Sequence, residues 1–157
     1  MVSWMMCTCM PSFNCSIRSI YLPCMQDTIL AQKPELLLPL GGRSVQVLNE
    51  GGYHWVTVTT ADGKAFLFES AHSSANTTIN SLLKRQLSHL LPPPREGDLQ
   101  VYVPWVQQQV GGSDCGLFVI AYTIEFAKGR MPEKARFSQA QKRQHLIKCF
   151  ESQEPLS

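Results

Sequence analysis

The 157-residue chain lacks the features that mark several classes of protein. No apolar run approaches the roughly 18 residues of a membrane span, so the sequence predicts no membrane segment. The formal net charge is only +2, which gives no reason to expect nucleic acid or an anionic membrane as the main partner. With 44% hydrophobic and 17% charged residues, the composition is typical of one globular domain.

The cysteines lack the spacing of a metal site or of a disulfide framework. None of the six is in CxxC spacing, and four lie within the first 24 residues. Structural zinc would need paired ligands at short spacing, and a disulfide framework would spread cysteines over the fold. We therefore expect no metal and a reducing, intracellular setting. We also expect no cofactor, and a location in the nucleus or the cytoplasm. The six are Cys7, Cys9, Cys15, Cys24, Cys115 and Cys149.

The start of the chain differs from the rest. It is rich in Met and Cys, and it has neither the charged start nor the apolar core of a signal peptide. We expect an irregular, disordered extension over 1–25, a domain over 26–151 and a tail over 152–157.

Hydrophobic periodicity predicts an α+β fold for the domain. The last helix is expected to begin with Ser138 and Gln141 in capping-box spacing. Its expected inward residues are Leu146, Ile147 and Phe150, and its expected solvent-facing residues are Lys142, Arg143 and Lys148. The predicted elements are a short helix over 26–32, strands over 45–49, 54–60, 65–70 and 99–104, and helices over 76–91, over 115–128 and from 138 onward.

Cys115 lies where a polar, glycine-rich loop becomes an apolar helix. The stretch QQQVGGSDCGLFVIAY, residues 107–122, places it in the first turn of a buried helix. Unpaired N–H groups and the helix dipole stabilise negative charge there, and the thiolate is the reactive form of cysteine. Gly112 and Gly116 leave room for a substrate. This segment alone fits a nucleophile and a small buried core residue equally well.

Of the four histidines, His54 has the position expected of a general base. It opens a predicted strand after the glycines of GGYHW, and catalytic groups are commonly held at strand ends. A strand-end histidine without a task is the alternative. His72, His89 and His145 are interpreted as solvated or packing residues.

Glu69 is the candidate that would orient His54. Asp62-Gly63 is a hairpin signal, so residues paired across the two strands should have numbers that add up to about 125. His54 then lies opposite position 71, within two residues of Glu69. Asp62 lies at the far end of the hairpin, about 25 Å away. An ordinary surface carboxylate is the alternative for Glu69.

Acyl chemistry also needs donors for the developing oxyanion. The backbone N–H of Cys115 is one candidate, and a side-chain amide among Gln107, Gln108 and Gln109 is another. We expect two of these three glutamines to be solvated loop residues.

At these residues the chain resembles the Ulp/SENP family of ubiquitin-like-protein proteases, which are papain-like cysteine peptidases. The family pattern has His-Trp opening a strand, an acidic residue before Ser at the end of its partner strand, and Gln before a Gly/Ser-Asp-Cys-Gly run. The resemblance covers about residues 26–151. The amino-acid sequence around these motifs is especially similar to versions of the domain in animal transposable elements. The matching residues are His54-Trp55, Glu69-Ser70, Gln109 and Gly111-Gly112-Ser113-Asp114-Cys115-Gly116.

The resemblance implies a papain-like α+β fold of the Ulp/SENP/adenoviral-protease type, with a central mixed or antiparallel sheet flanked by helices. It implies Gln109, six positions before the cysteine, as the oxyanion donor. It also implies a monomer that acts on a ubiquitin-like protein, such as SUMO, or on its conjugates. The implied substrate-binding residues are Trp55, which would cover the histidine, and Gly112, Ser113, Asp114 and Gly116.

Two departures from the family pattern bear on function. The family usually has Asp where this chain has Glu69, although the distantly related adenoviral protease resembles the chain in using Glu. The family's Trp-Leu-Asn/Asp motif, which helps to hold the substrate tail, is not recognisable in residues 1–25.

Three hypotheses follow from these residues. The first is a thiol hydrolase with Cys115 as nucleophile, His54 as base, Glu69 as orienter and Gln109 as oxyanion donor. The second is a degenerate, transposon-derived domain that binds ubiquitin-like or other proteins without cleaving them. The third, an α+β domain without a site, would leave three ordered motifs to chance.

Overall fold

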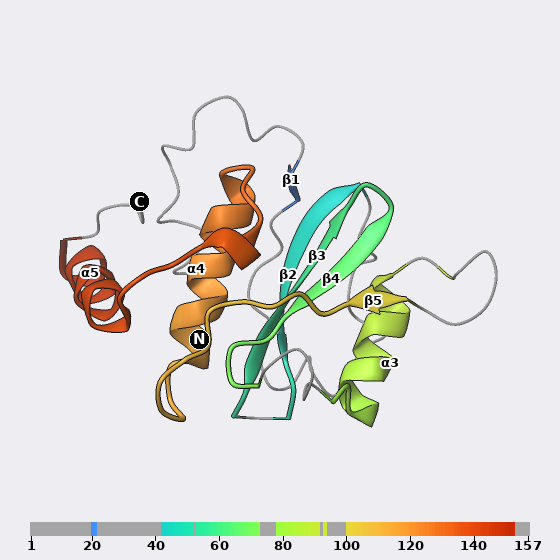
Figure 1. Ribbon diagram of the computed structural model, residues 1–157, viewed down its shortest axis with the longest axis horizontal. Helices are drawn as coiled ribbons and strands as arrows, with labels where there is room; N and C mark the ends of the chain where they lie inside the picture. Colours follow the sequence, from blue (N-terminus) through green and yellow to red (C-terminus); the bar gives the residue numbers. More distant parts are fainter. Residues whose placement is uncertain are drawn as a thin grey trace.

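In the computed structural model, a five-stranded mixed sheet lies at the centre of the fold (Figure 1). The structure describes residues 20–21, 42–51, 53–72, 78–91, 93 and 100–152. The strands follow the order β1-β2-β3-β4-β5, with parallel pairs at both edges and antiparallel pairs between them. They are β1 (Ile20–Tyr21), β2 (Arg43–Asn49), β3 (Trp55–Ala61), β4 (Lys64–Phe68) and β5 (Val101–Tyr102).

The Asp62-Gly63 hairpin fixes the register between β3 and β4. Both turn residues have positive φ angles, 52° for Asp62 and 73° for Gly63, as a two-residue turn between twisted strands requires. Thr57 is paired with Phe68 and Ala61 with Lys64, so the predicted register is confirmed. This register brings the start of β3 and the end of β4 to the same end of the sheet.

Two helices cover opposite faces of the sheet. One is α3 (Ser81–Leu90), whose buried leucines pack against Val56, Val58 and Leu67. The other is α4 (Cys115–Ala127), whose Phe118 and Tyr122 pack against Phe68. Successive strand residues point to opposite faces, so each helix meets alternate residues of the same strands. The predicted α+β fold, with a central mixed sheet flanked by helices, is confirmed.

Helix α4 is the buried helix that the sequence predicts. Nine of its 13 residues are buried, because one side packs on the sheet and the rest is covered by later segments. The helix ends before Gly129, whose φ of 77° allows the chain to turn back. Its first residue is Cys115, so the helix start that carries the candidate nucleophile is anchored in the core.

The last helix, α5 (Gln139–Ser152), does not pack as predicted. Ile147 and Phe150 were expected to face inward, yet they are 43% and 58% exposed, and Cys149 is the buried residue instead. The reason is that α5 lies beyond α4, away from the sheet, and only a narrow face of it is covered (Figure 1). Arg143 is exposed as expected, and it also forms an ion pair with Asp114.

Several other elements differ from the sequence prediction at their ends. Helix α3 begins at Ser81 rather than at residue 76, because the Asn80 side chain accepts a hydrogen bond from the Leu83 N–H (2.8 Å) and caps it there. The predicted strand over 99–104 is paired only at Val101–Tyr102. The predicted helix over 26–32 and most of the 1–25 extension lie outside the described residues, although Ile20–Tyr21 form β1.

The helices in the described part of the chain are short. Beside the three α-helices there is a 3₁₀ turn, η2 (Pro132–Lys134). None of the described helices has both the length and the apolar character that crossing a membrane requires.

Candidate active site

Three chain segments meet at one end of the sheet. His54 directly precedes β3, Glu69 directly follows β4, and Cys115 begins α4. The antiparallel register joins the first two, and the packing of α4 on the sheet supplies the third. The structure thus brings together the three residues that the sequence singled out as nucleophile, base and orienter.

Glu69 holds the imidazole of His54. The two carboxylate oxygens of Glu69 lie 2.9 and 2.7 Å from Nε2 of His54. The Ala71 backbone N–H donates to Oε1 of Glu69 at 2.6 Å, and the residue is only 3% exposed. A buried carboxylate needs such partners, so Glu69 is not an ordinary surface acid. With Nε2 bonded to Glu69, Nδ1 is the nitrogen left to exchange a proton with the thiol.

The surroundings of His54 favour its protonated form. The hydrogen bond with Glu69 is the main cause that raises the pKa of His54 to about 9. Burial acts in the opposite direction, while the charge of Glu69 and both a hydrogen bond and the charge of Cys115 add to the rise. The imidazolium therefore persists at neutral pH beside the sulfur, as a thiolate–imidazolium pair requires.

Cys115 is buried beside the backbone that leads to His54. Its side chain is enclosed, and its thiol donates to the backbone carbonyl of Tyr53 at 3.8 Å. The same side chain also hydrogen-bonds His54. A core cysteine without a task would have no reason to lie between a carbonyl and a protonated imidazole at a helix N-terminus. This environment favours the nucleophile over the core residue.

The three glutamines before the loop are all bonded within the fold. Gln107 exchanges two hydrogen bonds with the Phe137 backbone, at 2.8 and 2.9 Å, and Gln108 donates to the Glu69 carbonyl at 3.3 Å. Our expectation that two of the three are solvated loop residues is therefore wrong. Amides pair well with backbone groups. The amide of Gln107 therefore connects the loop to the segment before α5, and that of Gln108 connects it to the end of β4.

Gln109 lies next to Ser70. Its Oε1 accepts from the Ser70 hydroxyl at 2.9 Å, its Nε2 donates to the Gly111 carbonyl at 2.8 Å, and its backbone N–H donates to the Ser70 carbonyl at 2.8 Å. These bonds fix the amide beside the strand end that carries Glu69. One of the two N–H groups on Nε2 serves Gly111, and the second has the chemistry of an oxyanion donor.

Helix α5 holds the nucleophile loop from outside. Gln139 exchanges hydrogen bonds with both backbone groups of Val110, at 2.7 and 3.2 Å, and donates to the Asp114 carboxylate at 2.5 Å. Arg143 forms an ion pair with the other oxygen of Asp114. Asp114 directly precedes Cys115, so these contacts fix the backbone from which the thiol projects.

Of the remaining predicted substrate-binding residues, Gly112, Ser113 and Gly116 flank Cys115 in the sequence, and Trp55 directly follows His54. Trp55 is the half-buried first residue of β3, and Gly112 and Ser113 are exposed in the loop. A Cβ atom added at Gly112 or Gly116 would meet no protein atom within 4 Å. The packing of the fold therefore does not require glycine at these two positions. This agrees with glycines that leave room for a ligand.

Two groups near His54 were missed by sequence reasoning. Glu50 lies four residues before His54 in the same turn, with Oε2 of the glutamate 3.9 Å from Nε2 of the histidine. Asn80 holds it through a 3.0 Å hydrogen bond, and burial is the main cause that raises the pKa of Glu50. The ring of His72, interpreted as a solvated residue, lies edge-on to that of His54 with centroids 6.3 Å apart. The four-residue spacing of Glu50 and His54 is the sequence feature that could have indicated that their side chains meet.

Among the residues that the structure describes, Glu50, His54 and Glu69 form a group that could hold a metal ion. One ligand atom from each lies within 4.8 Å of the others. An ion at this position would have to replace the direct 2.7 Å hydrogen bond between His54 and Glu69. The arrangement is better suited to holding a proton on the imidazole, and the absence of a metal cofactor stays a prediction.

No protein-family model matches the chain, and no curated protein matches it. Solved structures that are similar to parts of it include SUMO protease Ulp1 with its catalytic cysteine oxidized to a sulfenic acid. That match has a TM-score of 0.48 and 17% sequence identity, and it covers 67% of this chain and 50% of that chain.

Two further solved structures have comparable similarity. Ulp1 with its cysteine oxidized to a sulfinic acid matches with a TM-score of 0.47 and 15% identity, over 64% of this chain and 48% of that chain. The C-terminal Ulp1 protease domain in complex with Smt3, the yeast ortholog of SUMO, matches with a TM-score of 0.45 and 17% identity, over 64% and 47%. The chain spans about half the length of these solved chains. Because these matches are partial, we assign the candidate site from the geometry of Cys115, His54 and Glu69.

Proposed function

We propose that the chain is a cysteine-type peptidase that hydrolyses peptide or isopeptide bonds after the Gly-Gly-like tail of a ubiquitin-like protein. One observation carries the proposal: a buried glutamate orients a histidine that contacts a cysteine at a helix N-terminus. We further propose a monomer that acts in the nucleus or the cytoplasm, with a ubiquitin-like protein or its conjugate as partner.

The residues suit acyl transfer through a thioester. The Cys115 thiol gives its proton to His54 before the substrate binds, which forms the thiolate–imidazolium pair. The thiolate then attacks the carbonyl carbon of the scissile bond to form a tetrahedral oxyanion. When the C–N bond breaks, the His54 imidazolium gives its proton to the leaving amine. Water then attacks the thioester while His54 accepts a proton, and collapse releases the carboxylate and restores the thiol. Glu69 keeps Nε2 of His54 bonded throughout.

The oxyanion would be held by the Cys115 backbone N–H and by Gln109. Gln109→Ala is expected to lower kcat by about 100-fold, because the lost donor acts on charge that develops in the transition state. Val110→Ala serves as the matched control, since Val110 is 83% exposed in the same loop. If the two variants have the same kcat, Gln109 is not an oxyanion donor.

The proposed function is tested by turnover of a panel of ubiquitin-like proteins that carry a fluorogenic amide on the C-terminal glycine. We expect release of the fluorophore from at least one member, and none from the Cys115→Ala variant. If the wild-type protein unfolds cooperatively yet turns over no member of the panel, the hydrolase proposal is wrong.

A binding module is the second candidate, and the position of Gln109 favours it. Its amide is already held on both sides, because its oxygen accepts from Ser70 and one of its two N–H groups donates to Gly111, so Gln109 has a role in the fold that needs no oxyanion. Under this hypothesis a ubiquitin-like protein binds with an affinity that Cys115→Ala leaves unchanged, and no turnover accompanies it. Binding of this kind together with turnover would exclude the hypothesis.

Arg143 is expected to act as a positioning residue through Asp114. Arg143→Ala should lower kcat by about tenfold with little change in KM, because a misplaced nucleophile weakens the transition state more than substrate binding. Arg143→Lys should restore part of the rate by keeping the charge beside Asp114. Lys148→Ala, an exposed change on the same helix, is the control. A rate for Arg143→Ala equal to that of the control would contradict this role.

A further inference from the structure

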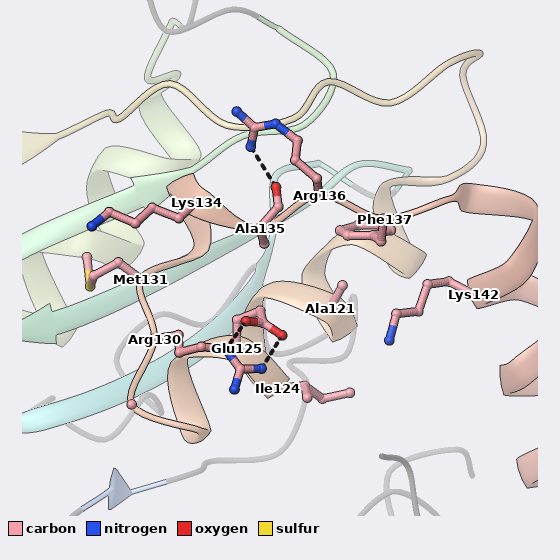
Figure 2. A pocket seen from close by; sticks show the side chains of 11 residues that line it. Ala121, Ile124, Glu125, Arg130, Met131, Lys134, Ala135, Arg136, Phe137 and Lys142 are labelled. Carbon is pink, nitrogen blue, oxygen red and sulfur yellow. Dashed lines mark hydrogen bonds and ion pairs between the residues drawn. The ribbon is translucent and has the colours of Figure 1, made fainter.

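A cavity lies on the outer side of α4, away from the candidate active site. It is an open hollow of about 630 Å³, lined by residues of α4, of the segment around η2 and of the start of α5 (Figure 2). We call it the basic cavity. The residues that define it are the apolar Ala121, Ile124 and Phe137 and the cationic Lys134, Arg136 and Lys142. Cys115, His54 and Glu69 do not line it.

The charges around the basic cavity are unbalanced. Glu125 is the one carboxylate among the described residues that line it, and Arg130 matches it through two hydrogen bonds of 2.5 and 2.7 Å (Figure 2). Lys134, Arg136 and Lys142 therefore remain as three cations without a carboxylate in the lining. For a chain with a net charge of only +2, this is a local concentration of positive charge.

One of these cations, Arg136, is held in a fixed position by its contacts with the fold. Nη1 of Arg136 donates to the backbone carbonyls of Glu133 and Ala135, at 3.0 and 2.6 Å, and its guanidinium lies 4.7 Å from the centre of the Trp105 ring. Lys142 extends from α5 toward α4, where its charge helps to lower the pKa of Glu125 (Figure 2). Because Arg136 is already fixed, it loses less side-chain entropy when it binds an anion.

The inner wall of the basic cavity is apolar. Ala121 and Ile124 come from the buried face of α4, and the Phe137 ring packs on Phe118 with centroids 4.8 Å apart. A hollow of this volume, with an apolar wall and a few fixed polar groups, is typical of a site that takes a side chain or a small group. An extended phosphate backbone would be served better by a broad basic surface than by such a hollow.

We propose that the basic cavity binds an acidic peptide segment of a protein partner. One apolar side chain of the segment enters the hollow against Ile124 and Phe137, and flanking carboxylates pair with Lys134, Arg136 and Lys142. The site does not use Cys115, so the proposal is independent of whether the chain is a peptidase.

The test is fluorescence anisotropy with a labelled octapeptide of glutamates that carries one central leucine. The protein is titrated as the full chain, both in its natural form and as Cys115→Ala, and we expect the two to bind equally. Changing the leucine to serine in the peptide should weaken binding by about tenfold, because the apolar wall loses its contact. Lys134→Glu with Lys142→Glu should also weaken binding by about tenfold or more, because two ion pairs become repulsions.

The matched control is Lys84→Glu with Arg85→Glu, an equal change of charge on the exposed face of α3. Its affinity should stay within about twofold of the natural protein, since screened charges at a distance contribute little. No binding at millimolar protein, an equal loss in the control, or tighter binding of a single-stranded oligonucleotide of the same charge would each overturn the proposal. Urea unfolding of each variant shows that it is folded.

Discussion

His54→Ala is expected to lower kcat/KM for a fluorogenic ubiquitin-like substrate by about 10⁴-fold, because it removes both the base that accepts the thiol proton and the acid that protonates the leaving amine. The structure gives the reason for so large an effect. Glu69 fixes the imidazole at 2.7 Å and Cys115 lies beside it, so the variant loses a base and acid that is already positioned for the thiol.

His72 provides the matched control for His54. Its ring lies only 6.3 Å from that of His54, yet the residue is exposed and follows the strand end rather than bridging Glu69 and Cys115. His72→Ala should therefore change kcat/KM by no more than about threefold, in line with a surface substitution. Comparable losses in the two variants would show that His54 has no special place in the reaction.

Glu69→Gln is expected to lower kcat by about 10³- to 10⁴-fold, because an amide cannot stabilise the imidazolium and does not fix its tautomer. The pH dependence should change as well. The pKa of His54 is about 9, mainly through Glu69, so the alkaline loss of activity in the natural protein should be centred near pH 9. In Glu69→Gln it should move toward the ordinary histidine value of about 6.5. Glu69→Asp, which keeps the carboxylate, should keep most of the alkaline limb.

The same ion pair predicts how folding stability varies with pH. The pKa of His54 is higher in the folded protein, about 9, than its ordinary value of 6.5. Its contribution to the free energy of unfolding is therefore fully present below about pH 6.5 and is lost as the pH rises through about 9. Urea unfolding between pH 6 and 9.5 should show this loss in the natural protein and a smaller one in Glu69→Gln. Equal pH dependence in both would contradict the pairing.

The hairpin explains why much of the site could be predicted from the sequence. Asp-Gly specifies a two-residue turn, the turn fixes the register, and the register places the residue before one strand beside the residue after the other. The pairing of His54 with Glu69 therefore follows from local sequence. The position of Cys115 at a helix start follows in the same way from the change from a glycine-rich loop to an apolar run.

Contacts between distant segments could not be predicted in this way. Helix α5 was expected to bury Ile147 and Phe150 because they lie at helical spacing, but α5 meets the body through polar residues in its first two turns. Periodicity shows that a helix has an apolar side; it does not show how much of that side another element covers. The role of Asp114 as the anchor for Gln139 and Arg143 depends on the same packing and leaves no local signal.

The proposed roles of His54, Glu69 and Gln109 all require that Cys115 is the nucleophile. The measurement is mass mapping of the adduct formed with a ubiquitin-like protein that carries an electrophile at its C-terminus. Cys149 is an internal control, because it is also buried and its sulfur lies 3.6 Å from Nε2 of His145. We predict an adduct on Cys115 alone, which His54→Ala abolishes. An adduct on Cys149 or another cysteine, or no adduct on Cys115 in folded protein, would contradict the account.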